Sequence, residues 1–345
     1  MTAENHSDID VAYDRTSLAA YLDGQNSTRT SCGPLARAVI EQAYIAEYGR
    51  QVEEQSCLNF LFFIHADRRS KFTPFGVFSD ERYHVVEGND RIASGLEAGL
   101  ARRAELGMEL VRIRRGASGG VELTLRSGSK THVRVHDAVV VSVPFSVLRG
   151  VEVDANLDLP AWKMAAINQL GYGDNAKMMV GFNSRPWSGL GGNGAAYADL
   201  ANVQATWETS PATATAAHAV LTDYSGGIRG ANLDRWPVQT DAANFLADLE
   251  RVYPGVQAAA VTSRGRVLAH LEHWPSNPWT RGSYTCYLPG QFTTIAGNEG
   301  KRVGNLLFAG EHTDSFYSYQ GFMEGAALSG LRAAVELLQQ VKASR

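Results

Sequence analysis

The chain has 345 residues, of which 44% are hydrophobic and 20% charged, a composition typical of a globular protein with a large buried core. Its formal net charge is −4 and it has no cluster of Lys and Arg, which argues against a nucleic-acid-binding protein because neutralising phosphates needs clustered cations. The N-terminus lacks the apolar stretch of a signal peptide, and no apolar run approaches the ~18 residues of a membrane span, so we expect a soluble, cytoplasmic protein. Cys32, Cys57 and Cys286 form no CxxC pattern, so we expect reduced thiols.

The first part of the chain, residues 12–65, is predicted to be helical. Leu18, Tyr21 and Leu22 recur at helical spacing, a second helix begins at Gly33-Pro34, and residues 51–65 read as a third. No strand is predicted in this block.

Short alternating runs separated by turns follow, and they predict strands with interspersed helices. The predicted strands are residues 83–87, 109–114, 121–126, 131–135, 138–144, 177–182, 203–208, 218–224, 267–273, 283–288 and 305–310. The predicted helices are residues 92–106, 162–170, 241–252 and 322–341. This irregular order favours two domains, with the chain crossing between them several times.

A glycine-rich stretch, Gly189 to Gly194, matches the GxGxxG pattern of dinucleotide-binding proteins, with Glu208 about 20 residues further on. That fingerprint needs a strand directly before the glycines and a helix directly after them. Here the preceding strand ends near Phe182, Pro186 intervenes, and the following AAYADLANV predicts only a weak helix. A glycine-rich hairpin loop is the favoured interpretation, and a true fingerprint is the alternative.

The C-terminal stretch FAGEHTDSFYSYQGFMEGAALSG reads as a strand, a glycine turn, a loop and a helix. Gly310 allows a ligand to approach the backbone closely, and the helix after Gly321 offers free N–H groups and the positive end of its dipole. These features predict a cradle for an anion or a cofactor. The alternative is a buried C-terminal helix preceded by a polar loop.

FAGEHT, GFMEGA and SGLRAA, between Phe308 and Ala334, resemble the C-terminal flavin-binding segment of the flavin-containing amine oxidases, the family of monoamine oxidases and L-amino-acid oxidases. VVEGN, VVVSVPFSVL, RPW and HWPSNPWTRGSY are similar to other segments of that family, in its order. The resemblance covers essentially the whole chain. It implies an α/β plus α+β fold, in which an incomplete FAD-binding (glutathione-reductase-like) domain joins an amine-oxidase-type substrate domain. The expected parts are residues 1–80 (helical part of the substrate domain), 81–152 (FAD-binding segment), 153–279 (sheet and helices of the substrate domain) and 280–345 (C-terminal FAD-binding segment).

For the cofactor, the resemblance implies six binding residues. Val111 would hold the adenine side through its backbone, Gly310 would allow close approach, and Glu311 would contact the ribityl region. Gly321 and Phe322 would lie where the helix begins, and Met323 would present its backbone N–H to the flavin C2=O.

For the reaction, the resemblance implies that Lys177 reaches flavin N5 through a water and that Trp274 packs beside the isoalloxazine. Tyr284 and Phe322 would form the two walls of an aromatic cage. Taken singly, Lys177 could also be a solvated lysine at a strand end. Trp274 and Tyr284 could also be core residues.

The sequence departs from the family pattern at three places. Phe322 stands where the monoamine oxidases usually have Tyr, so the cage loses a hydroxyl. Ser283 stands where covalent attachment of a flavin needs Cys, so FAD is expected to bind non-covalently. Gly88-Asn89 replaces the GG that follows the family's glutamate.

The implied activity is the FAD-dependent oxidation of an amine or amino acid, with dioxygen reduced to hydrogen peroxide. The family begins with a strand–GxGxxG–helix segment that does not precede Asp8, so we expect weak FAD binding by this chain alone and a second polypeptide that supplies that segment. An exposed edge of the interrupted sheet would also need covering. The alternatives are a truncated, non-catalytic homologue that acts as a binding or regulatory partner, and a flavin desaturase or porphyrinogen-type oxidase. No arginine that would bind a substrate carboxylate can be placed.

Overall fold

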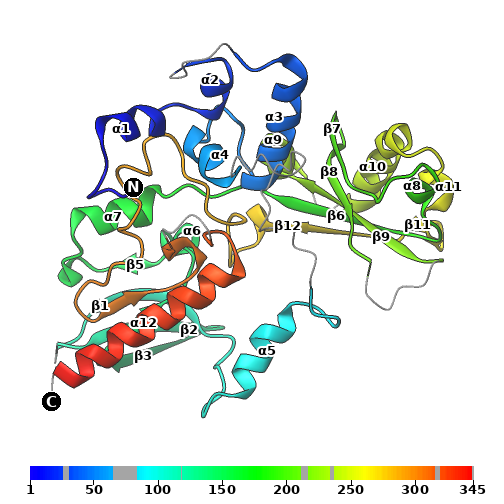
Figure 1. The fold of residues 1–345 in the computed structure, drawn as a ribbon. Helices are drawn as coiled ribbons and strands as arrows, with labels where there is room; N and C mark the ends of the chain where they lie inside the picture. Colours follow the sequence, from blue (N-terminus) through cyan, green and yellow to red (C-terminus); the bar gives the residue numbers. More distant parts are fainter. Residues whose placement is uncertain are drawn as a thin grey trace.

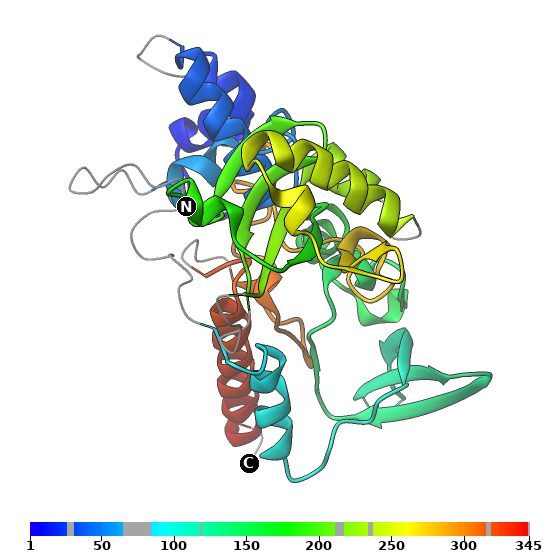
Figure 2. The same cartoon turned by 90° about the vertical axis from the view of Figure 1, so that its right-hand side faces the viewer.

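The computed structural model describes residues 1–25, 31–64, 84–117, 119–210, 217–233, 237–314 and 319–343. Figures 1 and 2 show a block of helices at the N-terminus, a lobe built on a five-stranded sheet, and a lobe built around the long C-terminal helix. In both lobes, strands far apart in the chain pair with each other.

The N-terminal block consists of four helices, α1 (Asp8–Asp14), α2 (Leu18–Leu22), α3 (Pro34–Tyr48) and α4 (Cys57–Phe63). The side chains of Ser7, Ser17 and Ser56 cap three of them, and Pro34 occupies the first turn of α3. Their apolar faces meet in one core that includes Leu18 and Tyr44. The helical prediction for this block is confirmed within the described residues, although the third helix begins at Cys57 rather than at 51 and position 65 lies outside them.

The second lobe contains an antiparallel sheet in the order β12-β6-β9-β8-β7. Helix α10 (Val238–Val252) packs against β8 and β12, while α3 packs against β7, β8 and β9. The strands are β6 (Ala176–Phe182), β7 (Ala196–Leu200), β8 (Val203–Glu208), β9 (Ala219–Ser225) and β12 (Ala269–His273).

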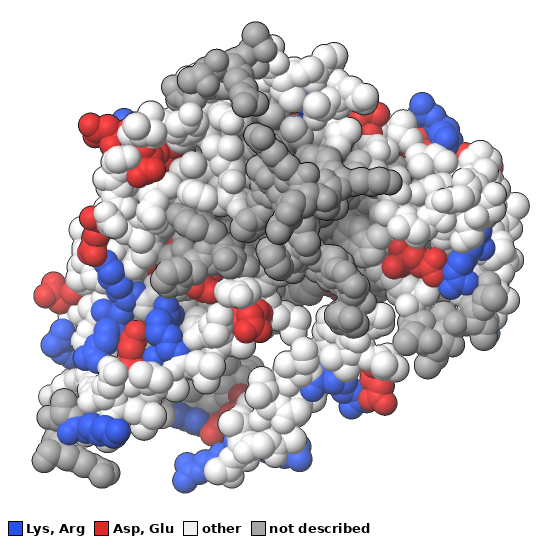
Figure 3. Space-filling model, in the orientation of Figure 1, with Lys and Arg blue, Asp and Glu red and all other residues white. Residues whose placement is uncertain are grey.

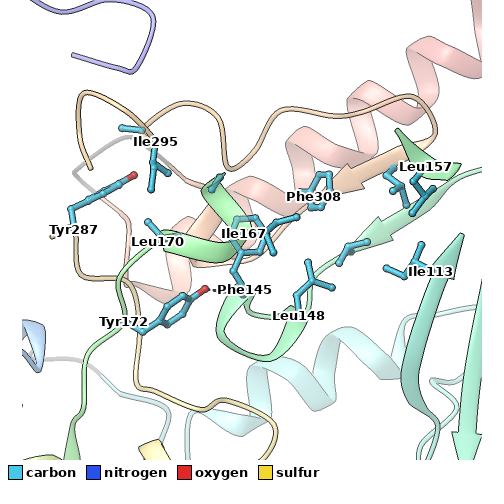
Figure 4. Close-up of a cluster of buried hydrophobic side chains, with 14 of the residues drawn as sticks. Ile113, Phe145, Leu148, Leu157, Ile167, Leu170, Tyr172, Tyr287, Ile295 and Phe308 are labelled. Atoms are coloured by element: carbon cyan, nitrogen blue, oxygen red, sulfur yellow. Dashed lines mark hydrogen bonds between the residues drawn. The ribbon is translucent and has the colours of Figure 1, made fainter. Parts of the chain in front are cut away.

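The third lobe is built around a parallel pair of short strands, β4 (Val139–Val141) and β13 (Leu306–Phe308), with α12 (Met323–Ala343) against β13. A separate sheet in the order β3-β2-β1-β5 lies beside them. Figure 4 shows the core between these parts, where Phe145 packs edge-on against Phe308 and its backbone N–H donates to the hydroxyl of Tyr172. The strands of the separate sheet are β1 (Glu109–Arg115), β2 (Val121–Ser127), β3 (Lys130–His136) and β5 (Glu152–Val153).

The remaining elements are short. They are α5 (Asp90–Ala98), α6 (Phe145–Leu148), α7 (Ala161–Gln169), α8 (Pro186–Gly189), α9 (Gly227–Asn232), α11 (Val256–Ala259), β10 (Thr262–Ser263), β11 (Arg266–Val267), and the 3-10 helices η1 (Ala155–Leu157), η2 (Trp274–Ser276) and η3 (Glu311–Thr313).

Two predicted strands are wrong. Residues 84–87 form a turn, because the side chain of Asn89 accepts a hydrogen bond from the N–H of Val85, whose carbonyl accepts from Gly88; position 83 lies outside the described residues. Residues 283–288 are extended but form a single bridge, Tyr172 with Thr285, because the glycine-containing segment 171–173 offers only a short partner.

Two predicted boundaries also differ, and one predicted helix is a strand. The helix predicted over 92–106 ends at Ala98, where Gly99 follows, and the strand predicted over 267–273 is broken at Leu268. The weak helix predicted for AAYADLANV is the strand β7: Ala196, Ala198 and Leu200 alternate and pack on the core of the five-stranded sheet. The glycine run therefore begins at the end of the short helix α8 and leads into a strand, the reverse of a dinucleotide fingerprint. It forms a loop, but the predicted hairpin is wrong because a helix and not a strand precedes it.

Within the described ranges no helix is both long and apolar enough to cross a bilayer, and no cluster of three potential metal ligands occurs. All three cysteines are unpaired. Figure 3 shows acidic and basic side chains interspersed at the lower left of the molecule. In the sheet of β1–β3, Arg126 pairs with Glu109, and Arg134 pairs with Glu105.

Candidate active site

A cavity of about 550 Å³ lies where the N-terminal helices, the five-stranded sheet and the start of α12 meet. It brings together Lys177, Tyr284, Gly321 and Phe322, four of the residues singled out from the sequence. Its other walls come mainly from α3, α4, β7, β8 and β9, and include Glu47, Tyr48, Asn59, Phe62, Phe63, Tyr197, Thr206, Trp207, Tyr224, Thr285, Phe292 and Gln320. The cavity is therefore lined largely by aromatic rings, with few charged groups.

Lys177 and Tyr284 are linked through Tyr224. The Lys177 ammonium lies 5.3 Å from the centre of the Tyr224 ring, and the Tyr224 hydroxyl donates a 3.1 Å hydrogen bond to that of Tyr284. The register of β6 and β9 explains this, because Lys177 lies directly opposite Tyr224 in the ladder. Tyr284 in turn donates to the backbone carbonyl of Glu47, so its ring is fixed at the hydroxyl end.

Phe322 stacks on an aromatic residue of α4. Its ring centre lies 6.3 Å from that of Phe63, with 14° between the planes. Tyr48 meets Phe63 edge-on at 6.2 Å. The position of Phe322 is therefore set by a row of rings that leads from the start of α12 into the helical block.

Glu47 is the one acidic residue, and Lys177 the one basic residue, among the described residues that line the cavity. Burial raises the pKa of Tyr284 and of Tyr197, and the negative charge of Glu47 raises both further. Tyr284 therefore spans the cavity wall, since Gly321 lies near the Cγ–Cδ2 edge of its ring and Glu47 lies at its hydroxyl.

Glu311 ties together two turns beside the cavity. One carboxylate oxygen accepts a 2.9 Å hydrogen bond from the backbone N–H of Gly321, and the other accepts from the Thr285 hydroxyl at 3.3 Å. Burial raises the pKa of Glu311 to about 7. Gly310, just before it, has φ +116° and donates its N–H to Ser329, and a side chain at Gly310 would collide with the ring of His312.

The N-terminus of α12 adjoins the cavity with its donors unused. The N–H groups of Met323, Glu324 and Gly325 donate to no acceptor in the described part of the chain, and the first intrahelical bond runs from Ala326 to Phe322. Such a helix end attracts negative charge. Met323 itself is 55% exposed at the first helical position.

Five predicted site residues do not line this cavity: Gly310, Glu311 and Met323 lie beside it, as described above, and Trp274 and Val111 lie elsewhere. Trp274 lies in η2, where its carbonyl accepts hydrogen bonds from Asn277 and Thr280. Val111 lies in β1, far along the third lobe, at a β-bulge where the ladder passes from Leu110 to Arg112. Their proposed contacts with the flavin remain predictions.

The amino-oxidase family model, described as flavin-containing amine oxidoreductase, matches residues 12–338, and the chain belongs to this family. Polyamine oxidase 3 of Oryza sativa subsp. japonica is 29% identical over 250 residues, covering 72% of this chain and 47% of that protein. Polyamine oxidase 2 of Arabidopsis thaliana is 28% identical over 258 residues, covering 74% and 49%. The chain thus spans about half the length of these relatives.

Solved structures show the same fold at low sequence identity. A cyclohexylamine oxidase from Brevibacterium oxydans IH-35A is 18% identical with a TM-score of 0.73, covering 97% of this chain and 70% of its own. A putrescine oxidase bound to putrescine is 17% identical with a TM-score of 0.76, covering 98% and 71%. The amine-oxidase-type fold, with α/β and α+β parts, is therefore confirmed.

The residues around the cavity fit the flavin that the family implies. The unused N–H groups at the start of α12 suit the electron-rich C2=O edge of the ring system. The Gly310 backbone turns where a residue with a side chain would strike His312, and Glu311 holds that turn to Gly321. These observations concern the part of the site near Gly310, Glu311 and the start of α12.

Sequence reasoning missed Glu47, Tyr224 and Phe63. A signal for Glu47 was present, because it follows Ala43 and Tyr44 at helical spacing and so places an acid on the apolar face of α3. Tyr224 and Phe63 carry no such signal, since aromatic residues in a strand or on a helix are usually core residues.

Proposed function

We propose that the protein acts in the FAD-dependent oxidation of an amine that carries a second positive charge, with FAD held non-covalently and dioxygen as the electron acceptor. The observation that carries this proposal is the cavity that unites Lys177, Tyr284 and Phe322 with Glu47. When bound, FAD would accept the electrons of the amine and pass them to dioxygen, giving an imine and hydrogen peroxide.

Tyr284 and Phe322 would position the reacting amine. Both line the cavity beside Gly321, close to the start of α12, and both rings are held by neighbours. The aromatic lining excludes water and so favours the neutral amine. The unused N–H groups of Met323 and Glu324 would stabilise negative charge that develops beside them.

Glu47 would bind the second ammonium group. Its backbone carbonyl accepts from the hydroxyl of Tyr284 and the start of α12 lies at the other end of that ring, so the two ends of the substrate would lie toward opposite ends of Tyr284. Relatives named as polyamine oxidases and a neighbour bound to putrescine support this substrate class. That a second polypeptide supplies a GxGxxG segment is a separate prediction.

The test compares putrescine with butylamine, its monoamine counterpart, on the flavin-loaded protein. We expect kcat/KM to favour putrescine, and Glu47→Gln to reduce that preference at least about tenfold, as expected for a lost charge-assisted hydrogen bond. Glu41→Gln serves as the control, because Glu41 lies on the same helix outside the cavity and pairs with Arg37. Equal preference in the wild-type protein and in Glu47→Gln would reject the role of Glu47, and a flavin-loaded protein without activity on any amine would reject the reaction.

A further inference from the structure

A chain of hydrogen bonds runs from the cavity into the core of the third lobe. The side-chain amide of Gln320, which lines the cavity, donates a 3.1 Å hydrogen bond to the hydroxyl of Tyr287. That hydroxyl donates to one carboxylate oxygen of Glu299, and the other oxygen accepts from the N–H of Gly297 at 2.8 Å. Tyr287 and Glu299 are 1% and 0% exposed, so the chain leads from a cavity wall to a buried carboxylate.

Lys163 stabilises the buried end of this chain. Its ammonium donates 2.7 Å hydrogen bonds to the backbone carbonyls of Asn298 and Glu299, and its side chain is fully buried as well. A buried carboxylate is costly unless an opposite charge and hydrogen bonds compensate for the lost water. Here the lysine supplies the charge, and the two donors named above supply the hydrogen bonds, so Glu299 is held as an acceptor.

The chain fixes which way the Gln320 amide faces. A tyrosine hydroxyl has one proton, and Tyr287 donates it to Glu299, so toward Gln320 its oxygen can only accept. The amide must therefore present its NH₂ group to Tyr287 and its carbonyl oxygen elsewhere. Gln320 is partly exposed, and that oxygen accepts no hydrogen bond from any residue that the structure describes. It is thus an acceptor at the cavity wall that a ligand can use.

Gln320 lies beside the two aromatic walls of the cavity. It directly precedes Gly321, which lies near the ring of Tyr284, and Phe322, which forms the other wall. In the proposed function the reacting amine lies between these rings in its neutral form, with N–H donors and a lone pair. A carboxylate at this place would favour the charged ammonium, whereas an amide oxygen accepts an N–H without adding a charge.

We infer that Gln320 is a further substrate-binding residue, whose carbonyl oxygen accepts an N–H of the reacting amine. Tyr287 and Glu299 are positioning residues, because they act by holding the amide in this orientation. The inference rests on the proposed function. It adds a neutral acceptor for the reacting nitrogen, separate from Glu47, which is proposed to bind the second ammonium group.

The test is anaerobic reduction of the flavin-loaded protein by butylamine, followed by stopped-flow at a series of amine concentrations. Butylamine has no second ammonium group, so its dissociation constant reports on Gln320 without Glu47. Gln320→Met keeps the length of the side chain but removes the amide, and we expect it to weaken butylamine binding about five- to tenfold, a change typical of one neutral hydrogen bond. Gln257→Met, at an exposed position of α11 in the lobe of the five-stranded sheet, is the matched control and should bind as the wild type does.

The pH profile distinguishes an acceptor from a residue that only fills space. Gln320→Glu keeps the shape of the side chain and places a negative charge beside the amine, which favours the charged form of the amine. The rise of the flavin-reduction rate with pH should therefore move to higher pH by at least about one pH unit in this variant. Gln320→Met, which adds no charge, should move it little.

The positioning role is tested with Tyr287→Phe, which removes only the hydroxyl. We expect butylamine to bind about threefold more weakly, and no further loss when Tyr287→Phe is combined with Gln320→Met, because both changes remove the same contact. Thermal unfolding checks that each variant is folded. Losses that add up in a folded double variant would overturn the role of Tyr287.

The possible failures can be told apart. An active wild-type protein whose butylamine binding and pH profile are unchanged in both Gln320 variants would overturn this inference alone. A wild-type protein whose flavin is reduced by no amine would reject the proposed function, and this inference with it.

Discussion

The carboxylate of Glu311 accepts a hydrogen bond from the backbone N–H of Gly321 at 2.9 Å, which joins the turn after β13 to the turn before α12. Burial raises the pKa of this carboxyl group from 4.5 to about 7. In the folded protein Glu311 therefore keeps its proton at a pH where the unfolded chain has lost it.

The first prediction follows from that difference. Between pH 4.5 and about 7 the folded state binds more protons at Glu311 than the unfolded state, so its contribution to stability is present at low pH and is lost as the pH rises through 7. The loss is on the order of 3 kcal/mol. Glu311→Gln, which keeps an acceptor for Gly321, should remove this negative contribution and so make the slope of the unfolding free energy against pH more positive in this window. Urea titrations at pH 5, 6, 7 and 8 measure it, and an unchanged slope in the variant would contradict the assignment.

Lys177 is expected to act on the oxygen half-reaction. Its ammonium lies over the ring of Tyr224 at the cavity. The family resemblance implies that this lysine reaches flavin N5 through a water. Lys177→Met should slow the reaction of reduced flavin with oxygen at least about tenfold, a loss typical of one removed polar group at a reacting centre. It should spare anaerobic reduction by the amine. Stopped-flow of the two half-reactions separates them, with Lys130→Met on the exposed strand β3 as control, and a defect confined to the reductive half would disprove the role.

Phe322 should contribute through its ring rather than through a polar group. Phe322→Ala removes the stacking on Phe63 and opens the cavity to water, so kcat/KM for the amine should fall by about one to two orders of magnitude, equivalent to about 1.4–2.8 kcal/mol. Phe322→Tyr keeps the ring and should retain most of the activity. Steady-state kinetics with putrescine measure both variants, and equal losses in the two would show that the ring face is not what matters.

Lys163 is predicted to be a stability residue. It is 0% exposed, its ammonium donates 2.7 Å hydrogen bonds to the carbonyls of Asn298 and Glu299, and it lies 4.0 Å from the centre of the Phe308 ring. Lys163→Ala leaves both carbonyls unpaired above a cavity and should cost about 2–4 kcal/mol of unfolding free energy. Lys163→Met fills the space and should cost less. Chemical denaturation at pH 7 decides, and an effect as small as that of Lys130→Met would refute the prediction.

The pH dependence of Lys163 has the opposite sign to that of Glu311. Burial lowers its pKa from 10.5 to about 7, so between these values the unfolded chain binds more protons and stability rises with pH. Comparing Lys163→Met with the wild type above pH 7, and Glu311→Gln with the wild type below pH 7, separates the two, because His312, whose pKa burial lowers to about 3, contributes below pH 7 with the same sign as Lys163.

Much of the fold could be predicted from the sequence where local pattern and tertiary packing agree. The helix over residues 34–48 begins at a Gly-Pro pair and keeps one apolar face, and β1, β2 and β3 alternate between turns. Where a single side chain redirects the backbone, the pattern fails. The amide of Asn89 turns Val85 away from a strand, and the small residues of β7 hide its alternation.

The same distinction separates the site residues that could be predicted from those that could not. Tyr284, Gly321 and Phe322 were predicted because they belong to contiguous motifs that resemble the family. Glu47 and Tyr224 were not, because their place beside Tyr284 depends on the packing of α3 and β9 against a segment that is 237 and 60 positions away in the chain, respectively. The spacing within α3 indicates that Glu47 lies on its apolar face, but it does not indicate which distant segment that face meets.

The pairing of β4 with β13 also sets an order for folding. Residues 139–141 leave the ribosome long before residues 306–308, the partners to which they are hydrogen-bonded. Until then the apolar strand β4 and the core beside Phe145 remain uncovered. The five-stranded sheet, in contrast, has all its strands once β12 has been synthesised. Contacts between such distant positions form slowly and leave apolar surface exposed in the meantime. We therefore expect the lobe of the five-stranded sheet to fold first during synthesis, and the lobe built around α12 to fold last.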